Sequence, residues 1–253
     1  MMAVLGWVPV WRRNFLVWRK LALPSLLGNF GEPLFYLLAL GYGFGSFIDQ
    51  VQGMPYLMFL ASGIVCGSAM NSATLEGLYS AYVRMSMQQT WEGILATPLS
   101  VRDVVVGEMM WTGTKALINS TPILVVAAAL GAVHDWSALW ALPVLLLAGL
   151  AFGAMALVVT SVATGFDFFM YYSTLIITPM FLLSGVFFPI EVMPGWVQGL
   201  AQWFPLTHVV AVVRPLVTGL PLVAPLLHLA VLAVCATAAL TAATWLLRRR
   251  LIR

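Results

Sequence analysis

The sequence predicts an all-α integral membrane protein built around six transmembrane helices, and three observations carry this prediction. Of the 253 residues, 62% are hydrophobic and only 8% are charged, and the mean hydropathy is +0.97. Such values lie far from those of soluble globular domains. Six apolar runs are long enough to cross a bilayer, which takes roughly 20 residues each. Most of the twelve Lys and Arg residues fall between or beyond these runs.

The first predicted element is an amphipathic helix within residues 1–22, which begins near Pro9. Its aromatic residues recur at helical spacing and so share one face: Trp7, Trp11, Phe15 and Trp18. Such a helix lies flat on a membrane surface. The segment lacks the basic, apolar and small-residue order of a secretory signal, so we expect it to be retained. The predicted spans follow at 24–46, 55–80, 104–131, 138–163, 170–188 and 223–247.

The loop at 84–103, between the second and third spans, contains a short helical run. Pro98 is expected to end this run, and Ser100 is expected to cap the next helix. The pattern fits either a surface loop of mixed polarity or an interfacial helix that another protein grips.

The segment 189–220, between the fifth and sixth spans, is apolar but interrupted. Pro189, Pro194 and Pro205 break it and Glu191 charges it, so no single straight span runs through it. A re-entrant or interfacial helical hairpin is the prediction.

The basic residues fix the expected orientation. With an even number of spans, one side receives Arg12, Arg13, Arg19, Lys20, Arg84, Arg102, Arg248, Arg249, Arg250 and Arg253. The positive-inside rule makes this side cytoplasmic, so both termini are expected there and 189–220 on the outer face.

Four charged residues fall inside predicted spans: Glu32, Glu108, Lys115 and, at the end of the second span, Glu76. A lysine near the middle of a span costs about 2.5–3.5 kcal/mol, so Lys115 needs a partner or water. Glu108 lies on the same face but about 10 Å away along the axis, so contact requires extended side chains or a bridging water. The alternatives for Lys115 are a buried ion pair, snorkelling, or direct contact with a substrate. Glu76 and Arg84 are expected at the membrane interface.

No catalytic residue, metal site or nucleotide site is expected on this chain. GEMMWTGTK at 107–115 lacks P-loop spacing, and GYGFG at 41–45 is no dinucleotide fingerprint. Ser184 with His208 suggests an intramembrane serine protease, but no orienting acid is evident. The histidines His134, His208 and His228 form no ligand spacing, and Cys66 and Cys235, both in apolar runs, suggest neither a disulfide nor a metal cluster.

The chain resembles permeases of the ABC-2 type exporter family over nearly its whole length, as a single domain, 1–253. The most specific runs are TWEGILATPLS at 90–100 and LLSGVFFPIEVMPGWVQGLAQWFPLTHVVAVVR at 182–214. VVVGEMMW, TGFDFFMYYSTLIITPMFLLSGVFFP and FPLTHVV are most similar to the nodulation branch, which is similar also to lipopolysaccharide and polysaccharide export permeases.

The resemblance implies a homodimer working with a separate ATP-binding subunit, of the kind that serves nodulation permeases. ATP and Mg²⁺ would bind that partner, and this chain would bind no cofactor and catalyse no reaction. The cargo would be a lipo-oligosaccharide or related glycolipid or polysaccharide, exported across the bacterial inner membrane. Membrane lipid is the other expected partner, and nucleic acid is not expected.

The resemblance also assigns roles to two groups of residues. Coupling to the ATPase is expected from Trp91, Glu92, Gly93, Ile94, Leu95 and Pro98. An apolar outer gate is expected from Phe187, Phe188, Pro189, Trp196, Trp203 and Phe204. Such a gate stays closed to water yet parts for an acyl chain or a sugar, although a purely structural roof is the alternative.

A transporter driven by an ion gradient, without an ATPase, is the competing interpretation. Its ion or proton path would use Glu32, Glu108, Lys115 and Asp167. Asp167 is otherwise expected at the cytoplasmic face, either receiving the ATPase or shaping a turn.

Overall fold

The computed structural model describes residues 5–48 and 50–251, apart from the side chains of residues 29 and 30; Arg253 and residues 1–4 lie outside this range. In chain order the elements are α1 (Trp7–Arg19), α2 (Ala22–Gly43), the 3-10 turn η1 (Phe44–Ser46), strands β1 (Gln50–Val51) and β2 (Met54–Pro55), α3 (Tyr56–Leu75), the π-helical stretches η2 (Glu76–Ser80) and η3 (Val83–Met87), α4 (Thr90–Leu95), α5 (Val101–Ala129), the 3-10 turn η4 (Trp136–Trp140), α6 (Ala141–Val162), α7 (Asp167–Tyr172), the π-helical stretch η5 (Ser173–Ile177), α8 (Thr178–Leu183), the 3-10 turn η6 (Ile190–Val192), α9 (Gly195–Ala201), α10 (Pro205–Thr218) and α11 (Pro225–Leu251).

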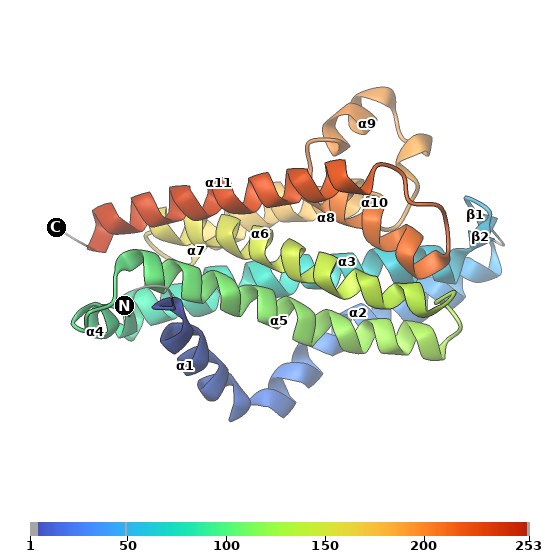
Figure 1. Ribbon diagram of the computed structural model, residues 1–253. Coiled ribbons are helices and arrows are strands. Elements are labelled where there is room, and N and C mark those ends of the chain that lie inside the picture. The colour runs from blue at the N-terminus through green and yellow to red at the C-terminus, as the bar shows by residue number, and fades with distance from the viewer. Residues whose placement is uncertain (1–4, 49, 252–253) are drawn as a thin grey trace.

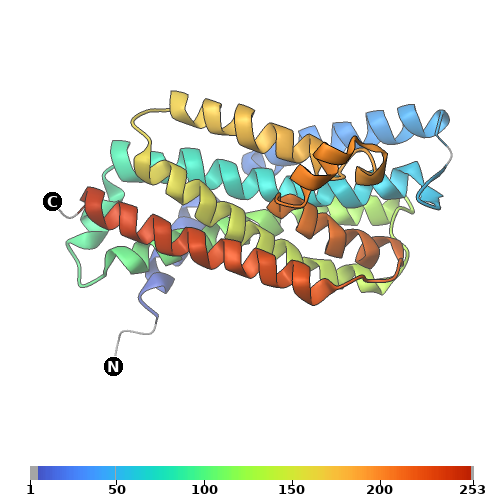
Figure 2. The same ribbon diagram turned by 90° about the horizontal axis from the view of Figure 1, so that it is seen from above.

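The long helices form an elongated bundle. Helices α3, α5, α6 and α11 run side by side along its axis (Figure 1, Figure 2). The most apolar stretch of the α3 helix is 83% buried, against 17% for α11, so α3 lies at the centre and α11 at the edge. Helix α4 and the last turn of α11 lie at one end of the bundle, and β1 and β2 lie at the other (Figure 1).

Among the described residues, three helices are long and apolar enough to cross a membrane: Tyr56–Met87, Trp136–Val162 and Pro225–Leu251. This confirms an all-α membrane fold. The runs predicted at 24–46, 104–131 and 170–188 also form helices, namely α2, α5 and the rod from α7 through α8. The rod is shorter, and α5 carries four charged residues that lower its hydropathy. The count of six spans stays a prediction.

The helix of the second predicted span is longer than expected. It continues through η2 and η3 to Met87 instead of ending near residue 80, because π-helical turns keep the chain helical. The first part of the predicted loop is therefore helix. Beyond it, Gln89 adopts the left-handed conformation and turns the chain into α4.

The hairpin of β1 and β2 was not predicted. Val51 pairs with Met54, and the two residues between them, Gln52 and Gly53, both have positive φ. Two such residues are what a tight two-residue hairpin turn requires. Strands of two residues carry too short a pattern to be seen in a sequence.

The segment 189–220 is bent, as its prolines predicted. Helices α9 and α10 meet at 87°, and Pro194 and Pro205 stand at their starts. Proline suits a first helical turn because the N–H it lacks would have no partner there. Helix α9 projects from the side of the bundle (Figure 1), whereas α10 packs against α3, α6 and α11.

Candidate functional site

Helix α4 divides into one buried anchor and an exposed remainder. Trp91 is fully buried, whereas Glu92, Gly93 and Pro98 are exposed and Ile94 and Leu95 are half-buried. The predicted cap is confirmed: the Asp103 backbone N–H donates to Ser100 Oγ, and the Asp103 carboxylate accepts from the Ser100 backbone N–H. The element thus offers an exposed face while one side chain holds it to the bundle.

Trp91 contacts a cluster of buried charged side chains, which is formed by Arg84, Glu76 and Glu108. Arg84 donates to both oxygens of Glu108, at 3.0 and 2.6 Å, and to Glu76 Oε1 at 2.9 Å. The Trp91 indole N–H donates to Glu108 Oε1 at 3.1 Å, and the Trp111 indole N–H to Glu76 Oε1 at 2.8 Å. Arg84 is buried within the protein, where two carboxylates satisfy its guanidinium. The position of Arg84 and Glu76 at the membrane interface stays a prediction. The cluster joins α4, α5 and the extension of α3.

Lys115 and Glu108 do not form the contact considered from the sequence. Lys115 Nζ donates to Ser25 Oγ at 2.9 Å and lies 5.6 Å from the centre of the Trp18 ring. Glu108 is instead occupied by Arg84 and Trp91. Neighbouring helices supplied closer partners than a residue two turns along the same helix.

The aromatic face of α1 packs on α5. Trp11 stacks on Phe15 with ring centroids 5.6 Å apart, and Phe15 and Trp18 both contact the ring of Trp111. The Trp11 indole N–H donates to Thr114 Oγ1 at 2.9 Å. The aromatic face of this amphipathic helix therefore packs against the rest of the protein.

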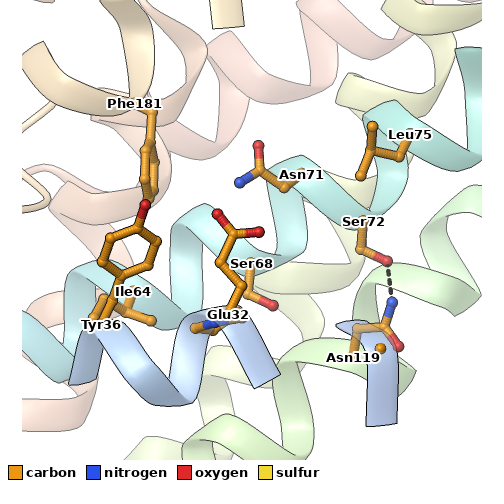
Figure 3. A pocket seen from close by; sticks show the side chains of 11 residues that line it. Glu32, Tyr36, Ile64, Ser68, Asn71, Ser72, Leu75, Asn119 and Phe181 are labelled. Atoms are coloured by element: carbon orange, nitrogen blue, oxygen red, sulfur yellow. Dashed lines mark hydrogen bonds between the residues drawn. The ribbon is translucent and has the colours of Figure 1, made fainter. Parts of the chain in front are cut away.

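A polar cavity of about 160 Å³ lies between α2, α3, α5 and α8 (Figure 3). Glu32 and Asn71 point into the same space, with Tyr36 and Phe181 to one side. At the far end Asn119 Nδ2 donates to Ser72 Oγ at 2.6 Å. Asn119 Oδ1 is buried and accepts no hydrogen bond from the described residues. The cavity is therefore rich in acceptors and suits a ligand that brings O–H or N–H groups.

A second cavity, of about 450 Å³, adjoins the polar one and shares with it Glu32, Tyr36, Asn71 and Phe181. Its other walls are mainly apolar and include Leu40, Ile177, Leu182, Phe187 and Phe188. The two cavities form one groove, polar at one end and aromatic at the other. Such a groove fits an amphipathic molecule.

The residues predicted for an outer gate differ widely in their exposure. Phe187 is buried and packs edge-on against Phe181, 5.0 Å between centroids, and Phe188 lines the groove. Trp196, in α9, is 74% exposed, and Trp203, just after α9, is 85% exposed. Pro189 and Phe204 are half-buried.

Arg214, on α10, is a buried residue that the sequence analysis missed. It donates to Ser62 Oγ at 3.0 Å and to the Gly185 carbonyl at 2.6 Å, and its guanidinium lies 3.7 Å from the Phe59 ring centre. It thereby ties α10 to α3 and to the turn after α8. An arginine inside an apolar run is the signal that would have found it.

Two histidines also meet, a contact that the sequence did not predict. His208 Nδ1 lies 2.8 Å from His228 Nδ1, because α10 packs against α11. No group of three metal-ligating side chains occurs in the described residues. Ser184 Oγ is buried without a described partner, while His208 contacts His228 and the Gln202 carbonyl, so no serine–histidine pair forms.

Residues 7–218 match the family model of ABC-2 type transporters, and the chain belongs to this family. It is 46% identical to Nodulation protein J of Rhizobium leguminosarum bv. viciae over 249 residues, 98% of this chain and 96% of the relative. Identity to Nodulation protein J of Rhizobium meliloti (strain 1021) is also 46%, over 98% and 94% of the two chains. The inner membrane transport permease YadH of Escherichia coli (strain K12) is 24% identical over 81% and 78%.

These matches confirm both the family and the similarity to its nodulation branch. With the three long apolar helices, they make the chain a multi-pass bacterial membrane protein of a transport family.

Proposed function

We propose that this chain is the permease subunit of an ATP-driven exporter. A separate ATP-binding subunit hydrolyses ATP with Mg²⁺, and two copies of the permease form the path through the inner membrane. The observation that carries the proposal is the link from α4, through Trp91 and the Arg84 cluster, to α3 and α5. These two helices also line the polar cavity.

The proposed topology has six spans, with α4 and both ends of the chain in the cytoplasm. Supporting this, α4 and the basic end of α11 lie at the same end of the bundle (Figure 1), and Arg248, Arg249 and Arg250 occupy the last turns of α11. The segment 189–220 then enters from the outer side. In a homodimer its exposed tryptophans, Trp196 and Trp203, face the second copy or lipid.

The proposed cargo is a lipo-oligosaccharide or a related glycolipid. Its sugar hydroxyls and amides meet the acceptors Glu32 and Asn119, and its acyl chain meets Phe181, Phe187 and Phe188. The similarity to Nodulation protein J supports this class of cargo.

Coupling begins at the exposed face of α4. Closure of two ATPase subunits pushes on Glu92 and Gly93, and Trp91 passes the displacement to Glu108 by its hydrogen bond. Because Arg84 holds Glu108 and Glu76 together, α5 and the extension of α3 move as a unit. The cavity that α3 and α5 form with α2 and α8 then changes shape, because the unit moves relative to α2 and α8.

The competing gradient-driven transporter has weaker support. Its ion path needs Glu108 and Lys115 to pass a proton or ion onward. Glu108 is held by Arg84 and Trp91, and Lys115 by Ser25. Asp167 is exposed at the start of α7.

Affinity purification from the native membrane in mild detergent, with mass identification of what is bound, tests the proposal. We expect a P-loop ATPase in equal amount together with glycolipid. Recovery of the permease alone, repeated after crosslinking, would contradict the exporter and direct attention to gradient-driven transport.

A further inference from the structure

Two more cavities meet on the outside of the bundle, where α1 passes the extension of α3. The first, of about 400 Å³, is lined by Arg13, Tyr79, Ser80, Arg84, Gln88 and Phe166. The second, of about 460 Å³, runs along α1 between the side chains of Val8, Pro9, Arg12, Leu16 and Lys20. Both include Arg13 and Val17. The geometry points to one site for an anionic phospholipid, with its phosphate in the first cavity and an acyl chain along the second.

The first cavity holds a cation whose charge is uncompensated. Arg13 donates to the neutral acceptors Asn14 Oδ1, at 3.0 Å, and Thr90 Oγ1, at 3.4 Å. Within the described residues no carboxylate forms an ion pair with it, whereas Arg84 has two. Burial, and then the positive charge of Arg84, lower the pKa of Arg13, while Glu108 acts in the opposite direction. An anion beside Arg13 would relieve this repulsion.

The other walls of the first cavity select a phosphate ester. A guanidinium offers paired N–H donors that match phosphate oxygens, and Ser80 and Gln88 line the same space. Tyr79 and Phe166 stack with ring centroids 6.0 Å apart and 11° between planes, which makes an apolar wall beside the charge. A head group with an attached glycerol fits this mixture.

The second cavity selects a lipid over a soluble phosphate. Its walls are almost wholly apolar in exposed area, and Leu16 and Val17 are 42% and 50% exposed. An acyl chain continuing from the phosphate removes this surface from water. Arg12 and Lys20 stand at its rim, where they attract an anionic membrane surface. The assignment depends only on charge and shape, so it does not rest on the proposed export function.

The test is a binding titration of the purified, delipidated permease with phosphatidylglycerol. Arg13→Gln should weaken binding about tenfold, since a hydrogen bond to a charged group contributes about 1.5 kcal/mol or more. The matched control is Arg19→Gln, which removes an exposed charge from the same helix outside both cavities; its effect should stay within about twofold. Equal losses in the two variants would overturn the site, because they indicate general attraction to a basic helix.

A second variant and two control ligands show which part of phosphatidylglycerol the site binds. Ser80→Leu narrows the first cavity without changing charge and should also weaken phosphatidylglycerol binding, which keeps the test informative if Arg13→Gln does not fold. Diacylglycerol, which has no phosphate, should bind equally weakly to the parent and Arg13→Gln. Inorganic phosphate that binds as tightly as phosphatidylglycerol would overturn the assignment of a lipid. Diacylglycerol that binds as tightly would overturn the proposed role of the phosphate.

Discussion

At the scale of single residues, two tryptophans enter the same charge cluster with the same chemistry. Trp91 donates to Glu108 from α4, and Trp111 donates to Glu76 from α5. Only Trp91 belongs to the short helix that is proposed to contact the ATPase. Comparing substitutions at the two tryptophans therefore distinguishes a role in coupling from a role in stability.

Trp91→Phe keeps an aromatic ring in the core but removes the N–H. In a reconstituted permease–ATPase complex, we expect cargo transported per ATP hydrolysed to fall about tenfold, because a hydrogen bond to a charged group contributes about 1.5 kcal/mol or more. Trp111→Phe is the control and should keep this ratio within about twofold. A similar loss in both variants would show that the cluster serves stability alone.

Asn119→Leu tests the acceptor at the polar end of the groove. The substitution removes the hydrogen bond from Asn119 to Ser72, but it also removes the buried, unpartnered Asn119 Oδ1, and Ser72 Oγ still donates to the Lys115 carbonyl. The thermal unfolding midpoint should therefore change little. Export of glycolipid from cells should nevertheless fall. Thr74→Val removes another unpartnered buried oxygen away from the cavity and should change neither quantity. A lower unfolding midpoint with normal export would assign Asn119 a structural role.

Residue types predicted which positions matter more reliably than which partners they meet. Glu108 and Lys115 were recognised because a charge in an apolar run needs compensation. Their partners, Arg84 and Ser25, lie 24 and 90 positions away in the chain. Helix packing decides such pairs, and no periodicity within one helix reveals them. The same reasoning applied to Arg214 would have found it, but not its bonds to Ser62 and Gly185.

At the scale of elements, hydrophobic runs located the helices and local chemistry located several of their ends. Ser100 caps α5 as expected, and the break predicted at Pro205 is the start of α10, since caps and prolines act on their own neighbours. The continuation of the α3 helix beyond residue 80, through η3, was missed because Arg84 there joins a buried charge cluster instead of facing water. The close approach of α3 to the turn after α8 was equally invisible.

Gly63→Ala tests that close approach. A Cβ at Gly63 would lie 2.5 Å from the carbonyl oxygen of Val186, an atom of the backbone that cannot turn aside. We expect the free energy of unfolding to fall by about 1–3 kcal/mol, as for overpacked cores. The measurement is the thermal unfolding midpoint in detergent, which should be lower. Gly31→Ala in α2 meets only ordinary contact and should be neutral or slightly stabilising. Equal midpoints for the two variants would contradict the packing of α3 against this turn.

At the scale of the whole molecule, the bundle has two chemically different ends. One carries α4 and the arginines of α11, and the other carries β1 and β2 (Figure 1). The proposed orientation assigns the first end to the cytoplasm. The positions of Lys and Arg in the sequence were enough to predict this orientation. The contacts of the proposed homodimer could not be predicted in the same way, because they involve a second copy of the chain.

Impermeant maleimide labelling checks the orientation. In a background without Cys66 and Cys235, Trp196→Cys should react in spheroplasts with an intact inner membrane, because it is exposed on the proposed outer side. Glu92→Cys should react only after the membrane is permeabilised. The reverse pattern would invert the proposed topology.

The unbroken helix Tyr56–Met87 exceeds the thickness of a bilayer. Its 32 residues would reach roughly 48 Å at the usual rise of an α-helix, against about 30 Å for the hydrocarbon layer and about 40–45 Å with the head groups. Helix α4 follows directly at the far end of this rod. In the proposed orientation, its exposed face would stand in water beyond the lipid head groups. The proposed ATPase would then reach it without entering the membrane surface, and the helix Tyr56–Met87 would act as a lever arm.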